Sequence, residues 1–137
     1  MSYLLDTNVV SEVVRARPSP DVVRWLRDVP DEALHLSVLS LGELRHGAER
    51  IGDGRRKEKL RLWIEQDVPA WFEERLLPIS AAVADRWGRL LAEMRRPVPA
   101  IDSLLAATAI THGLRLVTRN ERDFAFPGLE VLNPWGT

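Results

Sequence analysis

Short apolar runs alternate with longer amphipathic stretches along nearly the whole chain. Runs of the length typical of buried strands predict strands at residues 3–5, 34–37, 76–79, 116–118 and 129–132. Apolar residues at helical spacing between these runs predict helices at residues 9–15, 21–29, 40–51, 55–68, 80–94 and 100–112. This alternation is typical of a parallel sheet flanked by helices, so we expect an α/β fold with a mostly parallel, twisted sheet of about four to five strands.

Polar residues and glycines next to these stretches predict where several helices begin and end. Thr7 and Asn8 are expected to cap the first helix, and Ser40 is expected to begin the third. Ser40 and Glu43 also have the spacing of a capping box. Gly113 is placed to end the helix that begins at Ala100.

The composition is that of an ordinary globular protein. The 137 residues are 45% hydrophobic and 28% charged, which fits one domain spanning residues 1–137. The absence of cysteine excludes disulfides, thiolate zinc sites and cysteine nucleophiles. No apolar run approaches the roughly 20 residues that cross a bilayer, and residues 1–6 lack the pattern of a signal peptide. We therefore expect a cytoplasmic protein without a membrane segment.

Net charge is −1, which argues against duplex-DNA binding driven by a uniformly basic surface. All basic residues except Lys57 and Lys59 are arginines. The planar guanidinium group suits phosphate recognition. The same bias also arises from genomic base composition, so both explanations stay open.

Four acidic residues follow strands or begin helices in the predicted fold. Asp6 ends the first strand, and Glu43 is expected in the first turn of the helix after the second. Asp102 lies in the first turn of its helix, and Asp123 lies in the loop after the fourth strand. In a right-handed parallel wrap, strand carboxyl ends and the helix starts that follow them share one sheet edge, so these acids are expected to converge.

Each of these acids also has a purely structural interpretation. Asp6 would cap a helix, Glu43 would complete the capping box, Asp102 would complement a helix dipole and Asp123 would belong to a turn. Three polar neighbours are expected either to orient ligands or water or to serve as caps and turn residues: Asn8, Thr118 and Asn120.

Convergence of several carboxylates would create strong mutual repulsion unless a cation joined them. Oxygen ligands favour Mg²⁺, with Mn²⁺ as a possible substitute. Such an ion promotes phosphodiester hydrolysis by activating water and offsetting phosphate charge. Because Mg²⁺ keeps several waters, all four acids need not contact it.

Four segments resemble the ordered motifs of PIN-domain ribonucleases. These segments are LLDTNVVSE (residues 4–12), SVLSLGELRHG (37–47), DSLLAATA (102–109) and TRNERDF (118–124). The resemblance covers the whole chain and extends to Asn133, Pro134 and Trp135. It is strongest to VapC-type toxins of toxin–antitoxin pairs, in particular the FitB-like branch. The resemblance implies a PIN-like three-layer sandwich.

The resemblance also implies an Mg²⁺-dependent endoribonuclease that acts as a type II toxin. Asp6 and Asp102 would be the main metal ligands, Asp123 would complete the metal site, and Glu43 would help to hold metal or water. The implied partners are RNA, a second copy of the chain, and a small VapB-like antitoxin that inhibits the toxin and binds operator DNA.

A noncatalytic PIN-fold module that binds RNA or antitoxin is the alternative.

Two phosphoryl-transfer classes are disfavoured. Asn8 stands where phosphatases with an aspartate nucleophile need a second aspartate. Receiver domains need a lysine after a late strand, whereas Lys57 and Lys59 lie in a predicted mid-chain helix.

Overall fold

The computed structural model describes residues 1–136 and contains a five-stranded, fully parallel sheet in the order β3-β2-β1-β4-β5. The α/β prediction is confirmed. The strands are β1 (Tyr3–Leu5), β2 (Leu34–Ser37), β3 (Leu76–Leu77), β4 (Arg115–Val117) and β5 (Val131–Leu132). The helices are α1 (Thr7–Glu12), α2 (Pro20–Asp28), α3 (Val38–Arg50), α4 (Arg55–Leu62), α5 (Val68–Phe72), α6 (Ala81–Glu93) and α7 (Ala100–His112).

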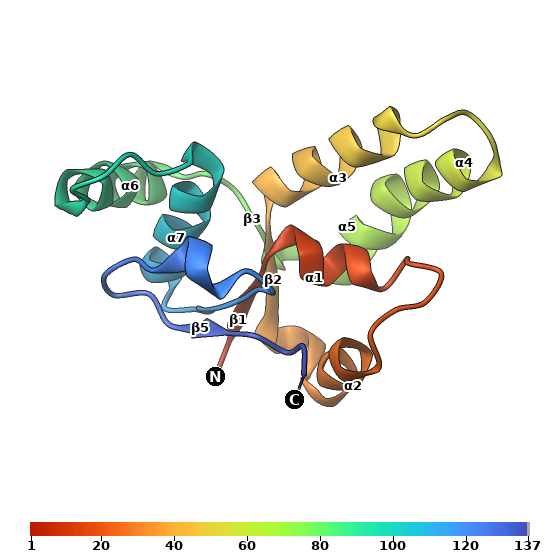
Figure 1. Cartoon of the computed structure of the whole chain (residues 1–137), viewed down its shortest axis with the longest axis horizontal. Coiled ribbons are helices and arrows are strands. Elements are labelled where there is room, and N and C mark those ends of the chain that lie inside the picture. Colours follow the sequence, from red (N-terminus) through yellow and green to blue (C-terminus); the bar gives the residue numbers. More distant parts are fainter. Residues whose placement is uncertain (137) are drawn as a thin grey trace.

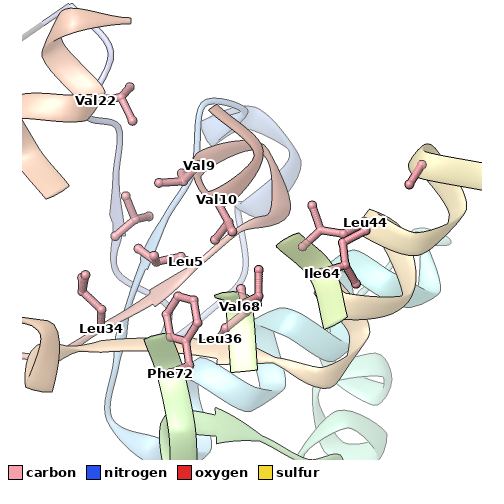
Figure 2. Packing of buried hydrophobic residues seen from close by; sticks show 12 residues of the cluster. Leu5, Val9, Val10, Val22, Leu34, Leu36, Leu44, Ile64, Val68 and Phe72 are labelled. Atoms are coloured by element: carbon pink, nitrogen blue, oxygen red, sulfur yellow. The ribbon is translucent and has the colours of Figure 1, made fainter. Parts of the chain in front are cut away.

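The sheet is the middle of three layers (Figure 1). Helices α6 and α7 cover one face, where Leu4 and Leu116 are buried against α7. The neighbouring strand residues Leu5 and Val117 point to the opposite face, into a second core with side chains from α1 to α5. Alternation of side chains along each strand therefore supplies both cores. Figure 2 shows Phe72 reaching from α5 into this second core near Leu34 and Leu36.

Two predicted helix starts were wrong. Asp6, not Thr7 or Asn8, caps α1, and its Oδ1 accepts a hydrogen bond from the Thr7 backbone N–H at 2.7 Å. Helix α3 begins at Val38 and is capped by Ser37, whose Oγ accepts from the Leu39 N–H at 3.0 Å. Strands β1 and β2 run directly into α1 and α3, so the cap of each helix is the residue at the end of the strand and not a residue further along.

Other boundaries differ by a few residues. The helix expected to end at Val68 continues through a π-helical turn (Trp63–Asp67) into α5 and ends at Phe72. This extension buries Val68 and Phe72 completely, which favours continued helix. Strands β3 and β5 are shorter than expected, and β4 spans Arg115–Val117.

Charged side chains join α3 to α4. Both carboxylate oxygens of Glu49 accept from Arg61, at 2.7 and 3.0 Å, and Arg45 donates to Glu49 at 3.2 Å. These hydrogen bonds, that from Arg61 foremost, lower the pKa of Glu49 to about 2.

In residues 1–136 we find no helix that is both long and apolar enough to cross a membrane.

Candidate active site

The register of the sheet brings the ends of its central strands to one edge. Leu5 is paired with Leu36 on one side and with Val117 on the other. The Asp6 N–H donates to the Val117 carbonyl at 2.9 Å, so Asp6 and Thr118 leave the sheet side by side. This edge is where ligands bind in parallel α/β sheets.

Asp6 forms the buried floor of the site and is only 8% exposed. Its Oδ2 accepts a hydrogen bond from the Thr118 hydroxyl at 2.8 Å and a longer one from Asn8 Nδ2 at 3.4 Å. The fully buried Thr118 hydroxyl also accepts from the Asn120 N–H at 3.0 Å. Asp6 is therefore both the helix cap considered as an alternative and a carboxylate held in one orientation.

Glu43 reaches the same edge from α3. The predicted place in the first turn was wrong: α3 begins at Val38, so Glu43 lies beyond that turn and the capping box with Ser40 is not formed. Instead, the Thr7 hydroxyl donates to Glu43 Oε1 at 2.6 Å and lies 2.9 Å from the hydroxyl of the buried Ser40. Thr7 thus links the end of β1 to the exposed carboxylate of Glu43.

Asp102 and Asp123 approach from the side of the sheet covered by α7. Asp102 is half-buried in the first turn of α7, as expected. Asp123 is exposed in the short 3₁₀ turn (Glu121–Phe124) after β4, where its N–H donates to the Asn120 carbonyl at 3.1 Å. Asp123 is therefore a turn residue, and its charge also acts on Asp6 and Asp102.

The four carboxylates are close enough to influence one another electrostatically. Burial is the main cause that raises the pKa of Asp6, and the charges of Glu43 and Asp123 raise it further against the lowering hydrogen bonds of Thr118 and Thr7. Burial likewise raises the pKa of Asp102, followed by the charges of Asp6, Asp123 and Glu43. The charges of Glu43, Asp102 and Asp123 therefore act together with that of Asp6, as expected of acids at one sheet edge, while their shared metal site stays a prediction.

The donor set fits a hard divalent cation. All four acidic side chains offer oxygen, and their mutual repulsion is what a bound cation relieves. Within residues 1–136, no three acidic or histidine side chains already stand at the spacing of a coordination shell. Mg²⁺ keeps several waters and is held through few carboxylates, so not all four acids need bind it directly. Direct ligation by Asp6, Asp102 and Asp123 stays a prediction.

Sequence reasoning missed the contribution of Thr7 and of Ser40 beyond capping. The signal available was a hydroxyl residue directly after the acid that ends a buried strand. Its partner Glu43 lies on another helix, so only the packing of α1 against α3 reveals the pair.

The chain is thus an α/β protein with a fully parallel sheet between two helical layers and acidic side chains at the carboxyl edge of the sheet. The PIN-domain family model matches residues 3–127, and the chain belongs to this family.

Three comparisons show how far the likeness extends. The chain is 35% identical over 135 residues to toxin FitB of Neisseria gonorrhoeae, covering 96% of this chain and 97% of that protein. It is 32% identical over 135 residues to VapC ribonuclease Y4jK of Sinorhizobium fredii, with 96% of each covered. The structure of FitAB bound to the IR36 DNA fragment matches with a TM-score of 0.89 and 33% identity, covering 98% of this chain and 96% of that chain.

Proposed function

We propose that the protein is an Mg²⁺-dependent endoribonuclease that acts in the cytoplasm as the toxin of a type II toxin–antitoxin pair. The observation that carries the proposal is that three carboxylates from separate elements, Glu43, Asp102 and Asp123, lie close enough to the buried Asp6 for their charges to act on one another. Similarity to toxin FitB and to VapC ribonuclease Y4jK supports the same activity.

Asp6, Asp102 and Asp123 would hold the cation, and Glu43 would help to hold the cation or a water. When bound, Mg²⁺ lowers the pKa of a coordinated water and offsets negative charge on phosphate oxygens, and Mn²⁺ is a possible substitute.

The chain's own groups orient this cluster. The Thr118 hydroxyl and the Thr7 N–H fix the two oxygens of Asp6, and the Thr7 hydroxyl fixes Glu43. Asn8 contacts both Asp6 and Thr118, each at 3.4 Å, and Asn120 supports Thr118 through its backbone N–H. These contacts aim the carboxylates before a substrate arrives, so less reorganisation is needed in the transition state.

Cleavage of RNA in the presence of Mg²⁺ tests the proposed function. Wild-type protein and Asp102→Asn are incubated with total cellular RNA, and the fragment ends are mapped. We expect internal cleavage by the wild type only, stopped by EDTA and restored by added Mg²⁺. Absence of cleavage with both Mg²⁺ and Mn²⁺, while RNA binding persists, would instead favour a noncatalytic module.

Replacing Thr118 by valine isolates the orientation of Asp6. The variant keeps the shape of the side chain but removes the hydroxyl that donates to Asp6. We expect cleavage to fall about 10- to 100-fold, the range found for groups that orient metal ligands. Thr111→Val is the matched control because, among residues 1–136, its hydroxyl donates only to the Ala107 carbonyl within α7. Equal activities for the two variants would show that Thr118 does not orient the site.

A cavity beside the acids supports binding of an antitoxin segment. Its volume is about 310 Å³, and its walls include Thr7 and Glu43. Apolar side chains form much of the rest, among them Leu44 of α3, Ile51 just after it, Leu60 of α4 and Trp63 of the π-helical turn. A partner segment placed here would cover the approach to Glu43 and thereby inhibit the site.

The proposed function also implies how the protein assembles with its partners. We expect a homodimer inhibited by a small VapB-like antitoxin, whose own DNA-binding part would attach the complex to operator DNA. The match to FitAB bound to a DNA fragment supports this assignment.

A further inference from the structure

A second cavity lies along the turn that follows β4. It has a volume of about 480 Å³ and is lined by Arg119, Asn120, Glu121, Arg122 and Asp123. The cavity therefore includes one of the four clustered acids. The backbone N–H of Arg119 donates to Asn8 Oδ1 at 3.4 Å, and Asn8 in turn contacts Asp6. Its size falls within the range of small-ligand pockets and is sufficient for a nucleotide.

Arg119 is held in place at this cavity by an aromatic ring. Its guanidinium carbon lies 5.3 Å from the centre of the Trp135 ring, a cation–π contact. Trp135 is itself fixed, because it packs against the core and its backbone N–H donates to Asn133 Oδ1 at 2.9 Å. Asn133 Nδ2 also donates to the Arg119 carbonyl at 3.4 Å. The C-terminal segment and the turn after β4 thus hold each other.

The charge of Arg119 is available to a ligand. The residue is exposed, and among residues 1–136 its guanidinium forms no ion pair. By contrast, Arg45 and Arg61 are both engaged by Glu49. The contact with the Trp135 ring uses none of the guanidinium N–H groups as hydrogen-bond donors to a carboxylate, so they can donate to a ligand. A planar donor edge of this kind suits a phosphate group.

We propose that Arg119, positioned by Trp135, binds an RNA phosphate next to the scissile one, and that the adjoining nucleotide occupies the cavity between Arg119 and Asp123. The inference rests on the proposed ribonuclease function and adds a substrate-positioning residue to it. Its physical role is to attract the polyanion toward a site whose own carboxylates repel it. Arg119 acts on substrate binding and not on the bond-breaking step.

The test measures kcat and KM for Arg119→Gln, Arg119→Lys and Trp135→Leu at several salt concentrations. The substrate is a single-stranded RNA oligonucleotide that the wild type cleaves, selected from a random-sequence pool. Arg27→Gln is the matched control, because Arg27 is also exposed but lies on α2 and pairs with the adjacent Asp28. Binding of the same RNA to the Asp102→Asn protein, with and without Arg119→Gln, is measured by fluorescence anisotropy.

We expect Arg119→Gln to raise KM about 10-fold or more, with a much smaller change in kcat, as for loss of a charge-assisted hydrogen bond. The slope of log affinity against log salt is negative, and its magnitude should decrease by about 0.7, the value for one phosphate contact on a single strand. Arg119→Lys should restore the salt slope but only part of the affinity, since lysine lacks the planar donor edge. Trp135→Leu should raise KM by a smaller factor.

Three results would overturn the inference. Arg119→Gln would match Arg27→Gln in KM and salt slope, or it would lower kcat with KM unchanged, as expected of a purely structural role for the turn. The third is an effect confined to antitoxin binding, which would assign Arg119 to the protein partner. In each case cleavage by the wild type would leave the proposed function standing, whereas a wild type that cleaves no RNA with Mg²⁺ or Mn²⁺ overturns both.

Discussion

Asp6→Asn is expected to lower RNA cleavage at least about 1,000-fold, because loss of metal-based charge stabilisation costs several kcal/mol and each factor of ten corresponds to about 1.4 kcal/mol. Asn is nearly isosteric with Asp and still caps a helix, so α1 should stay intact. The measurement is the rate of cleavage of a defined RNA at saturating Mg²⁺, with circular dichroism to confirm the fold.

The same substitution should not lower the melting temperature in metal-free buffer. Burial raises the pKa of Asp6 in the folded protein, so its ionised form costs stability as pH rises above the ordinary value of 3.8. A neutral asparagine removes this cost together with the repulsion from Glu43 and Asp123. Asp85→Asn, at an exposed ion pair on α6, is the control and should keep full activity. Retention of more than a tenth of the wild-type activity by Asp6→Asn would argue against the assigned role.

Phe72→Ala is expected to destabilise the fold by about 3–5 kcal/mol, the usual cost of emptying a large aromatic site in a core. Phe72 is fully buried and its ring lies at the sheet end of α5, among Leu34, Leu36 and Val68 (Figure 2). The free energy of unfolding of the wild type and of Phe72→Ala is measured by urea denaturation at one temperature. The effect should be on stability and not on the cleavage rate of the folded fraction.

Leu62→Ala is the matched control for this prediction, because Leu62 at the end of α4 is 53% exposed. Its substitution should change stability by no more than about 0.5 kcal/mol, as for most surface positions. If Phe72→Ala were no more destabilising than Leu62→Ala, the packing of α5 against β2 described above would be incorrect.

The order of strands and helices could be predicted because buried strands are short apolar runs, whereas the helices have apolar residues at helical spacing. The run Tyr3–Leu5 and the helix Ala100–His112 have the expected bounds. Helix starts were harder, since Ser37 and Ser40 are equally suitable caps by residue type. Only the direct passage from β2 into α3 selects Ser37, and that passage is a tertiary feature.

The acidic cluster could likewise be predicted from topology alone. Parallel strands bring Asp6 and the turn after β4 to one edge, and α7 begins at that edge with Asp102 in its first turn. Sequence could not give the gradient from buried Asp6 to exposed Asp123, because burial depends on how the two helical layers close over the edge. The Thr7–Glu43 and Arg119–Trp135 contacts join separate elements and were equally invisible.

Anomalous X-ray diffraction from a crystal soaked in Mn²⁺ measures most directly whether the acids form one cation site. The account predicts a manganese peak beside the carboxylates of Asp6 and Asp102 in the wild type, and its loss in Asp6→Asn crystals soaked identically. Carboxylates of Asp6 and Asp102 that point away from each other, with no peak between them, would contradict it.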